Sequence, residues 1–317
     1  MGERTTTGEG VQSKTDARVT PNAWHGRVCV VLSALVVCAS LGSTSLLQAQ
    51  SPTPAVSTRV STTPGTCNYD LTDASLTSKG WSKQLEETFD SLAQWRSWTS
   101  GAFNDELQFY QPANLELVDG VLLIHARKES STGPTDPFNP ALKSFAYTSG
   151  RIESKSAFSA GDSTPRVRIM ARIKLPSGYG LWPAFWSYGD GWPTEGEIDI
   201  LEARGEEPLM YSTNYFFGRV VNQNLVRNAV TTVRSSTSLQ QCWHVYEVIW
   251  ARNSLTFRFD GRVVDVKRGG YVRSLFGKRQ RVALNLAVGG NFFTALDTSR
   301  IQTGTMQVDW VKVFTAR

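Results

Sequence analysis

From residue 67 onward, apolar and polar side chains alternate with a period of two, which is the pattern of half-buried β-strands. In "TPRVRIMARIKLP", Val167, Ile169 and Ile173 share one face, while mainly arginines occupy the other. Asp119-Gly120 and Asp260-Gly261 each separate two apolar runs, as tight hairpin turns do. Long amphipathic helical patterns are lacking. This part of the chain is therefore predicted to be an all-β sandwich or jelly roll of about 250 residues.

The first 66 residues differ from the rest in composition. An apolar run over residues 28–41 is shorter than the roughly 20 residues that a membrane span needs. Residues 1–50 are therefore predicted to be an N-terminal tail plus signal peptide, with a small-residue cleavage site at Leu47-Gln48-Ala49. Because the tail is long, an uncleaved signal anchor with the domain outside is the alternative. Residues 51–66, rich in Ser, Thr and Pro, are predicted to be a linker, and residues 67–317 one catalytic domain.

The four cysteines fall into two pairs. Cys29 and Cys38 lie in the predicted signal segment. Cys67 and Cys242 remain as an even pair in a domain that is expected to be exported, so a disulfide between them is predicted. Two separate buried thiols are the alternative, since a sequence does not reveal the geometry that a disulfide needs.

Composition and charge exclude some classes of partner. The formal net charge is +5, and lysines and arginines are scattered rather than clustered. Neither zinc-finger spacing nor an RNA-binding signature is present, so no nucleic-acid partner is expected. Contact with a membrane is expected only if the N-terminal segment stays uncleaved. Ten tryptophans and 11% aromatic residues indicate a globular protein.

The segment "EGEIDILE" places four acids within a stretch that otherwise reads as a buried strand. Glu197 and Asp199 share a face because they are two residues apart. Strict alternation would turn Glu202 to the opposite face, whereas a one-residue β-bulge near Ile200–Leu201 would bring it to the same one. A register that groups Glu195 with the first two acids is the alternative. The bulged strand would present three carboxyl groups in a row.

Such a row suits glycoside hydrolysis. A retaining glycosidase uses two carboxyl groups about 5–5.5 Å apart, one as nucleophile and one as acid/base. Three close acids cannot all ionise easily, so at least one should keep its proton near neutral pH. On spacing alone, a solvated strand face or a calcium site would also be consistent. Trp182, Trp186 and Trp192 lie just upstream and favour a saccharide site, because indole rings stack on the apolar faces of sugars.

Seven blocks then follow in the order of a known family. They are "NDELQFY" (104–110), "VDGVLLIHARKE" (118–129), "YTSGRI" (147–152), "LPSGYGLWPAFW" (175–186), "GEIDILE" (196–202), "LNLAVGGN" (284–291) and "VDWVKVF" (308–314). Over roughly residues 85–315 the chain resembles glycoside hydrolase family 16, in its laminarinase-like (endo-β-1,3-glucanase) branch. The extra residue in E-I-D-I-L-E resembles the bulged laminarinase version, whereas the lichenase and xyloglucan-transferase branches have the shorter E-x-D-x-E.

The resemblance implies a curved jelly-roll sandwich of two antiparallel sheets, with a glycan cleft on the concave face. Glu197 resembles the nucleophile, Glu202 the general acid/base and Asp199 the carboxylate that tunes both. The residues that the resemblance assigns to substrate binding are Trp182, Trp186, Asn104, Arg151 and, more weakly, Glu106 and Asn291.

The chain departs from the family pattern in places. Asn214 stands where the family has a histidine, so this position carries no charge. Thr88 replaces a glutamate that helps many members to bind a structural calcium, which leaves Asp309 as a weakly supported ligand. Hydrolysis by two carboxyl groups needs no cofactor, so no required cofactor or catalytic metal is predicted. His125 and His244 are expected to be structural residues of strands.

The sequence thus predicts a secreted, monomeric, retaining endo-glycosidase that hydrolyses a β-1,3-linked glucan such as laminarin by double displacement. One alternative is a catalytically silent β-glucan-binding recognition protein. Such relatives usually lack one of the acids, and all three are present here. A second alternative keeps the chemistry and changes either the glycan, to a galactan, or the acceptor, from water to a sugar.

Overall fold

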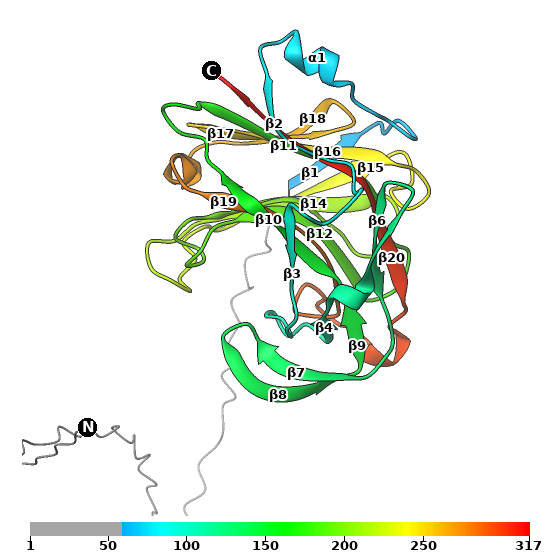
Figure 1. The fold of residues 1–317 in the computed structure, drawn as a ribbon. Helices are drawn as coiled ribbons and strands as arrows, with labels where there is room; N and C mark the ends of the chain where they lie inside the picture. The colour runs from blue at the N-terminus through cyan, green and yellow to red at the C-terminus, as the bar shows by residue number, and fades with distance from the viewer. Residues whose placement is uncertain (1–58) are drawn as a thin grey trace, which may run out of the picture. The chain divides into compact units, whose positions relative to one another are not determined.

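The computed structural model describes residues 59–317, so the predicted signal segment, Cys29, Cys38 and the first half of the predicted linker lie outside the described residues. Two large β-sheets, A and B, are stacked face to face in the described part (Figure 1). The strands of these sheets pair antiparallel, except β1 with β15, so the prediction of an all-β sandwich of two antiparallel sheets is confirmed. No helix within residues 59–317 is long and apolar enough to cross a membrane.

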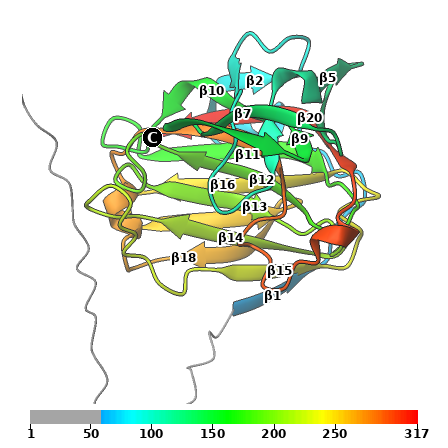
Figure 2. The same ribbon diagram turned by 90° about the horizontal axis from the view of Figure 1, so that it is seen from below.

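Sheet A has eight strands. In spatial order they are β1 (Arg59–Thr63), β15 (Thr231–Ser235), β14 (Met210–Phe216), β13 (Glu197–Glu202), β12 (Leu181–Tyr188), β19 (Gln280–Val288), β10 (Arg151–Phe158) and β3 (Trp95–Ser97). Seen from below, β12, β13, β14 and β15 lie side by side, and β1 lies at the edge (Figure 2).

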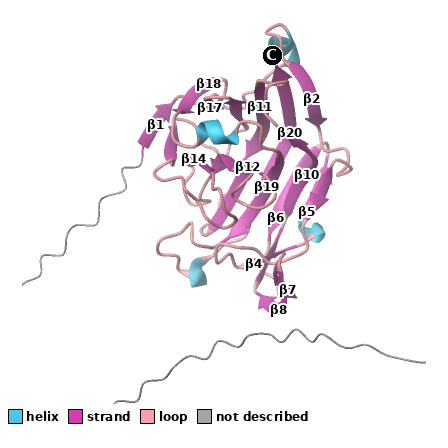
Figure 3. Cartoon of the chain, turned by 90° about the vertical axis from the view of Figure 1, so that its left-hand side faces the viewer, coloured by secondary structure: helices cyan, strands magenta, loops and turns pink. Residues whose placement is uncertain are grey.

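Sheet B covers one face of sheet A. Its strands are, in spatial order, β18 (Arg262–Lys267), β17 (Ser254–Phe259), β16 (His244–Ala251), β11 (Arg166–Lys174), β20 (Gly304–Ala316), β6 (Val121–Ala126) and β5 (Leu115–Val118), with β2 (Ser82–Glu87) also paired to β20. Helical structure in the described residues is confined to short segments (Figure 3). These are α1 (Asp73–Thr77) and three 3₁₀ turns, η1 (Pro112–Asn114), η2 (Val272–Leu275) and η3 (Thr298–Arg300).

The main core lies between the sheets. Ile198, Ile200 and Leu201 of β13 are each at most 1% exposed and pack in this core. The bulge buries both Ile200 and Leu201, although they are neighbours in the chain. Full burial of each such side chain contributes about 1.5–3 kcal/mol to the stability of the fold. These core-facing side chains therefore fix the position of β13 in the sheet.

The two Asp-Gly hairpins predicted from the sequence are present. Asp119-Gly120 connects β5 to β6, with φ angles of 49° and 76°, and Asp260-Gly261 connects β17 to β18, with 48° and 73°. Two successive positive φ angles define the turn type that matches the twist of a hairpin, and Asp-Gly adopts it readily.

The end of the predicted linker belongs to the sheet, which corrects the boundary at residue 66. Arg59–Thr63 form β1, and β1 pairs with β15 in parallel register. The segment "RVSTT" has too few apolar side chains for its sequence alone to predict a strand. It is ordered because β15 offers an unpaired edge whose N–H and C=O groups need partners.

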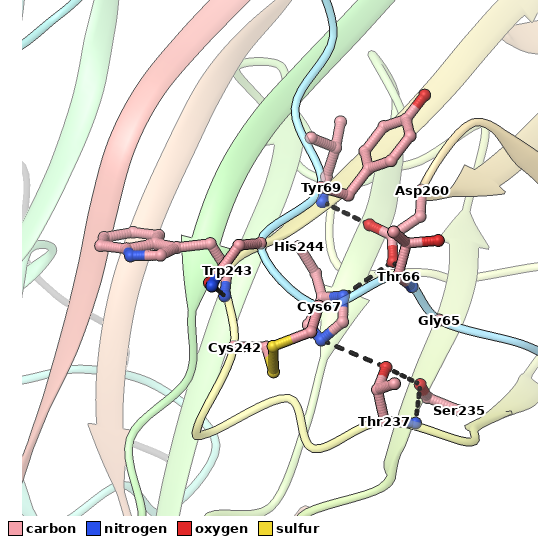
Figure 4. A network of polar contacts seen from close by, with 12 residues as sticks. Gly65, Thr66, Cys67, Tyr69, Ser235, Thr237, Cys242, Trp243, His244 and Asp260 are labelled. Atoms are coloured by element: carbon pink, nitrogen blue, oxygen red, sulfur yellow. Dashed lines mark hydrogen bonds and ion pairs between the residues drawn. A yellow bond between two sulfur atoms is a disulfide. The ribbon is translucent and has the colours of Figure 1, made fainter.

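The first residues after β1 are fastened to the core by a disulfide and a buried polar network (Figure 4). Cys67 and Cys242 are bonded, with their Cα atoms 5.0 Å apart. The Thr66 N–H donates to Asp260 Oδ2 over 2.9 Å, and His244 Nδ1 lies 2.7 Å from the same oxygen. Because His244 is fully buried in this network, it has a structural environment and not a catalytic one.

Two small pairs of strands lie outside the two large sheets. β4 (Gln108–Tyr110) pairs in parallel with β9 (Tyr147–Ser149), and β7 (Ser131–Asp136) forms a hairpin with β8 (Asn139–Phe145). The hairpin lies below β3 and β4 in Figure 1, and β7 lies on the β10 side of sheet A in Figure 2.

Candidate active site

The catalytic candidates lie on β13, and the predicted bulge is present there. Asp199 pairs with Asn214 of β14 and Glu202 pairs with Ser212, so a single residue of β14 lies opposite both Ile200 and Leu201. The pairing with β12 shifts at the same place. The extra residue turns Glu202 to the side that Asp199 already occupies, which confirms the predicted bulge.

The three carboxyl groups lie on the side of sheet A that is turned away from sheet B, which we call the carboxylate face. Asp199 is 3% exposed, whereas Glu197 and Glu202 are partly exposed. The alternative register is wrong, because the Glu195 side chain lies elsewhere. It accepts from Lys278 Nζ over 3.0 Å and from the Arg279 N–H over 3.1 Å.

Burial and mutual repulsion raise the pKa of all three acids. Burial, and then the charge of Glu202, raise the pKa of Glu197 to about 8. The pKa of Asp199 is raised well above its usual range by burial and by Glu197, and that of Glu202 by burial and by Asp199. Asp199 Oδ2 is buried without a hydrogen-bond partner. A proton on this carboxyl group, donated to Glu197, would satisfy it and is compatible with an ionised Glu197.

Trp182 contacts the acid/base candidate directly. Its Nε1 donates to Glu202 Oε1 over 3.1 Å, and this hydrogen bond opposes the rise in the pKa of Glu202. The Trp182 ring stacks on Phe292, with the centroids 4.6 Å apart and 10° between the planes. Arg204 lies over the Phe292 ring at 4.7 Å and donates to its carbonyl oxygen over 2.8 Å. Trp182 is therefore held in a fixed orientation beside the acids.

A hydrogen-bonded chain runs from Trp186 into the interior. Trp186 Nε1 donates to Asn285 Oδ1 over 2.7 Å, and Asn285 Nδ2 donates to the Tyr110 hydroxyl oxygen over 3.1 Å. Tyr110 in turn donates to Glu106 Oε2 over 3.1 Å. Glu106 is 8% exposed and burial raises its pKa. Glu106 therefore lies behind Trp186 and helps to fix the orientation of that ring. This position favours a structural role for Glu106 over the direct contact with a sugar that the sequence suggested.

Arg151 lies among aromatic rings on the same face. Its guanidinium carbon is 3.5 Å from the centroid of the Trp98 ring, 4.7 Å from that of Trp186 and 5.3 Å from that of Tyr188. Aromatic faces attract cations, so these rings hold the guanidinium in place. The positive charge of Arg151 also acts to lower the pKa of Glu197. Arg151 thus links the aromatic rings to the nucleophile candidate.

Asn104 and Asn291 form part of the rim. The Asn291 N–H donates to the Asn104 carbonyl oxygen over 2.8 Å, and both residues are exposed. Both flank Gly290, where a Cβ would lie 3.0 Å from the Asn104 oxygen and 3.2 Å from the Trp182 ring. The φ of Gly290 is +94°, a value that also favours glycine. The structure therefore brings Asn104, Asn291 and Trp182 together.

A structural calcium does not fit the residues around Asp309. Its Oδ2 accepts a hydrogen bond from Arg172 over 2.5 Å, and a guanidinium at this distance takes the place that a cation would need. Within residues 59–317, no cluster of three or more acidic, His or Cys side chains suits a metal ion. His125 of β6 also has local partners, Thr305 and Glu116, each 2.9 Å from a ring nitrogen.

Sequence reasoning missed three residues of the carboxylate face. Trp98 stacks on Arg151, Tyr188 donates to Glu153, and Asn285 orients Trp186. A polar Asn285 inside the apolar run "VALNLAV" was a usable signal. Tyr188 is two residues after Trp186 on β12, so the shared strand face was a second signal. Trp98 had none, because its partner Arg151 is distant in sequence.

A β-sandwich that presents two glutamates, a bridging aspartate and several aromatic rings on one sheet face defines a carbohydrate-cleaving hydrolase. One carboxyl group can attack while a second holds the proton for the leaving group.

Comparison with known proteins specifies the class further. The chain belongs to the glycosyl hydrolases family 16, whose model matches residues 104–312. It is 32% identical over 238 residues to "Glucan endo-1,3-beta-glucosidase A1" of Niallia circulans, a match that covers 68% of this chain and 33% of that protein. The chain thus spans about a third of that relative's length. It is also 32% identical over 240 residues to "Glucan endo-1,3-beta-glucosidase" of Cryptopygus antarcticus, covering 68% and 83% of the two chains.

Among solved structures, the endo-β-1,3-glucanase from Pyrococcus furiosus superposes with a TM-score of 0.63 at 29% identity. The match covers 75% of this chain and 95% of that one. The jelly-roll fold expected from the sequence is that of this neighbour.

Proposed function

We propose that this family 16 glycosyl hydrolase is a retaining endo-β-1,3-glucanase. The observation that carries the proposal is the bulged strand β13, which presents Glu197, Asp199 and Glu202 on one face. The names of the relatives from Niallia circulans and Cryptopygus antarcticus, both glucan endo-1,3-beta-glucosidases, support the linkage.

In the first step, ionised Glu197 attacks the anomeric carbon while protonated Glu202 gives its proton to the leaving glycosidic oxygen. In the second step, Glu202, now ionised, takes a proton from water, and this water displaces Glu197 from the sugar. Two displacements keep the anomeric configuration. Burial and the neighbouring Asp199 raise the pKa of Glu202, which favours the protonated form that the first step needs.

Asp199 acts on Glu197 rather than on the sugar. Once protonated, it donates a hydrogen bond to the nucleophile and keeps a second negative charge away from it. Trp182, fixed by Phe292, and Trp186, fixed by Asn285, are proposed to stack on glucose rings. Arg151, Asn104 and Asn291 offer donors for sugar hydroxyls at the rim. Hydrolysis by this route requires no cofactor.

We further propose that the protein works outside the cell as a monomer. The Cys67–Cys242 disulfide is the type of bond that forms in exported proteins. The export signal predicted in residues 1–50 supports this proposal, and retention by an uncleaved anchor is the alternative. Recovery of the mature protein from the medium, with its N-terminus sequenced, distinguishes the two.

The test uses the purified full-length protein, wild type and Glu197→Gln, with laminarin as substrate. Wild type should release short oligosaccharides from within the chain, and the products should first appear with the β configuration by proton NMR. Glu197→Gln should release none. Cleavage of agar or another galactan in place of laminarin would overturn the linkage. Tight laminarin binding by wild type without cleavage of any glycan would overturn the enzymatic proposal.

A further inference from the structure

A row of aromatic rings leaves the carboxylate face and reaches the tip of the β7–β8 hairpin. It begins at Trp98, which lies over Arg151. Phe103 meets Trp98 edge to face with the centroids 6.4 Å apart, and Phe138 lies 5.9 Å from Phe103 at an interplanar angle of 31°. Consecutive rings are in contact, so the row continues the proposed sugar site outward.

The outer end of this row is exposed. Phe138 is 87% exposed and Phe103 is 41% exposed, and Leu142 of β8 is 75% exposed. Scattered exposed apolar residues are normal, but a contiguous exposed patch beside a binding site commonly belongs to it. These rings make no contribution to the core, so their exposure calls for a partner outside the molecule.

The hairpin that carries Phe138 is anchored at its base and shaped at its tip. The Gly101 N–H donates to the Pro134 oxygen over 2.9 Å, and a Cβ at Gly101 would clash with the Thr135 oxygen. At the tip, Asp136 Oδ1 accepts from the Phe138 N–H over 2.8 Å. Phe138 is therefore presented on an ordered turn, and binding there does not have to order a loose loop first.

We propose that Phe103 and Phe138 form a remote glycan-binding subsite that takes the part of a long β-glucan chain lying beyond the catalytic residues. This inference rests on the proposed function and extends it. The faces of glucose rings are weakly apolar and stack on aromatic side chains. The surroundings suit a sugar rather than an apolar protein surface, because β8 is exposed from Asn139 through Ser144 and carries several polar side chains.

A remote subsite has a characteristic kinetic signature. A polymer held at Phe138 keeps its neighbouring units near the acids at a high effective concentration, whereas a short oligosaccharide cannot reach both places. The subsite should therefore lower KM for polymeric substrate and leave the cleavage of short oligosaccharides unchanged.

The experiment measures KM and kcat of the full-length protein on laminarin and on a laminari-oligosaccharide of four or five units. Phe138→Ala and Phe103→Ala should raise KM for laminarin roughly three- to tenfold, given the usual strength of aromatic contacts. The values of kcat on laminarin and kcat/KM on the oligosaccharide should not change. Phe138→Trp should restore the wild-type KM, whereas Phe138→Leu, apolar but without a ring, should not. Val263→Ala, exposed by 52% on β18 of sheet B, is the matched control.

Two results would overturn the proposal. One is an unchanged KM for laminarin in Phe138→Ala. The other is an equal loss on laminarin and oligosaccharide, together with a lower sedimentation coefficient, which would mean that the patch joins two copies of this chain. Failure of the proposed function is distinguishable, because wild type itself would then cleave neither substrate.

Discussion

Two groups of buried acids in this protein have opposite surroundings. On sheet B, Glu247 is 1% exposed and meets two guanidinium groups, that of Arg168 at 2.5 Å and that of Arg258 at 2.6 Å. On sheet A, Asp199 is equally buried, but its neighbours are Glu197 and Glu202. In the part of the chain that the structure describes, none of these three acids forms an ion pair.

The acid of sheet B contributes to the stability of the fold, whereas the acids of sheet A contribute to the chemistry of the site. A buried charge that meets its counterions is stable only while both partners are present. Buried acids that face one another keep protons that they would lose in water, and a proton-holding acid beside an ionisable nucleophile is what glycoside cleavage needs. Substitutions should therefore have opposite consequences in the two groups.

The largest effect is expected on activity from the carboxylate face. Glu197→Gln and Glu202→Gln each keep size and remove the reacting carboxyl group, so kcat should fall by more than about 10³-fold. Initial rates on laminarin measure this. Glu195→Gln is the control, since Glu195 lies on the same segment but pairs with Lys278 off the face. A comparable loss in Glu195→Gln would contradict the assignment of the register.

The next effect is expected on stability from sheet B. Glu247→Gln leaves Arg168 and Arg258 without their counterion, which should cost about 3–5 kcal/mol of unfolding free energy. For a domain of this size, that lowers Tm by roughly 10 °C. Scanning calorimetry measures the shift, and kcat at 20 °C should stay within a factor of two of wild type. An unchanged Tm would show that the ion pairs do not stabilise the sheet.

Asp199→Asn should stabilise the protein as it harms catalysis. The pKa of Asp199 is raised on folding, so above about pH 4 the unfolded carboxyl group ionises while the folded one keeps its proton, and stability is lost as the pH rises. Asparagine has no such dependence. The Tm of the variant relative to wild type should therefore rise from pH 4 to pH 8. A difference that shrinks over this range would refute the raised pKa.

The smallest effect is a shift of the alkaline limb of kcat/KM, which follows the loss of the Glu202 proton. Trp182→Phe removes a donor that stabilises ionised Glu202, so the pKa of Glu202 should rise and the limb should move up. Asp199 raises this pKa once it has itself ionised on the alkaline side, so Asp199→Asn should move the limb down. Each shift should be roughly half a pH unit. Profiles from pH 5 to 11 test the two signs, and a common direction would contradict the hydrogen bond.

The sequence predicted those features of the fold and the site that depend on a few neighbouring residues. The bulge could be inferred because three acids on one strand share a face only if a residue is inserted, and the Asp-Gly turns because few dipeptides tolerate two positive φ angles. The strand β1 could not, because its order comes from the edge of β15 and not from its own side chains.

Contacts between distant residues were equally unpredictable. The ring of Phe292 on Trp182, and Trp98 on Arg151, join segments that only the folded sheet brings together. The substitution of Asn214 for the family's histidine was visible, and the structure adds that this residue lies directly opposite Asp199. With a neutral side chain at that place, the positive charges of Arg151, Lys267 and Arg204 oppose the rise in the pKa values of the acids that burial causes.

The position of the Cys67–Cys242 disulfide also has a mechanical consequence. A pulling force applied at Arg59 first loads the hydrogen bonds between β1 and β15, and β1 can be pulled off without disturbing β13. The covalent bond at Cys67 then transfers the load to residue 242, ahead of β16 in sheet B. Residues 59–66 can thus detach from the sheet under tension while the catalytic strand β13 stays in place.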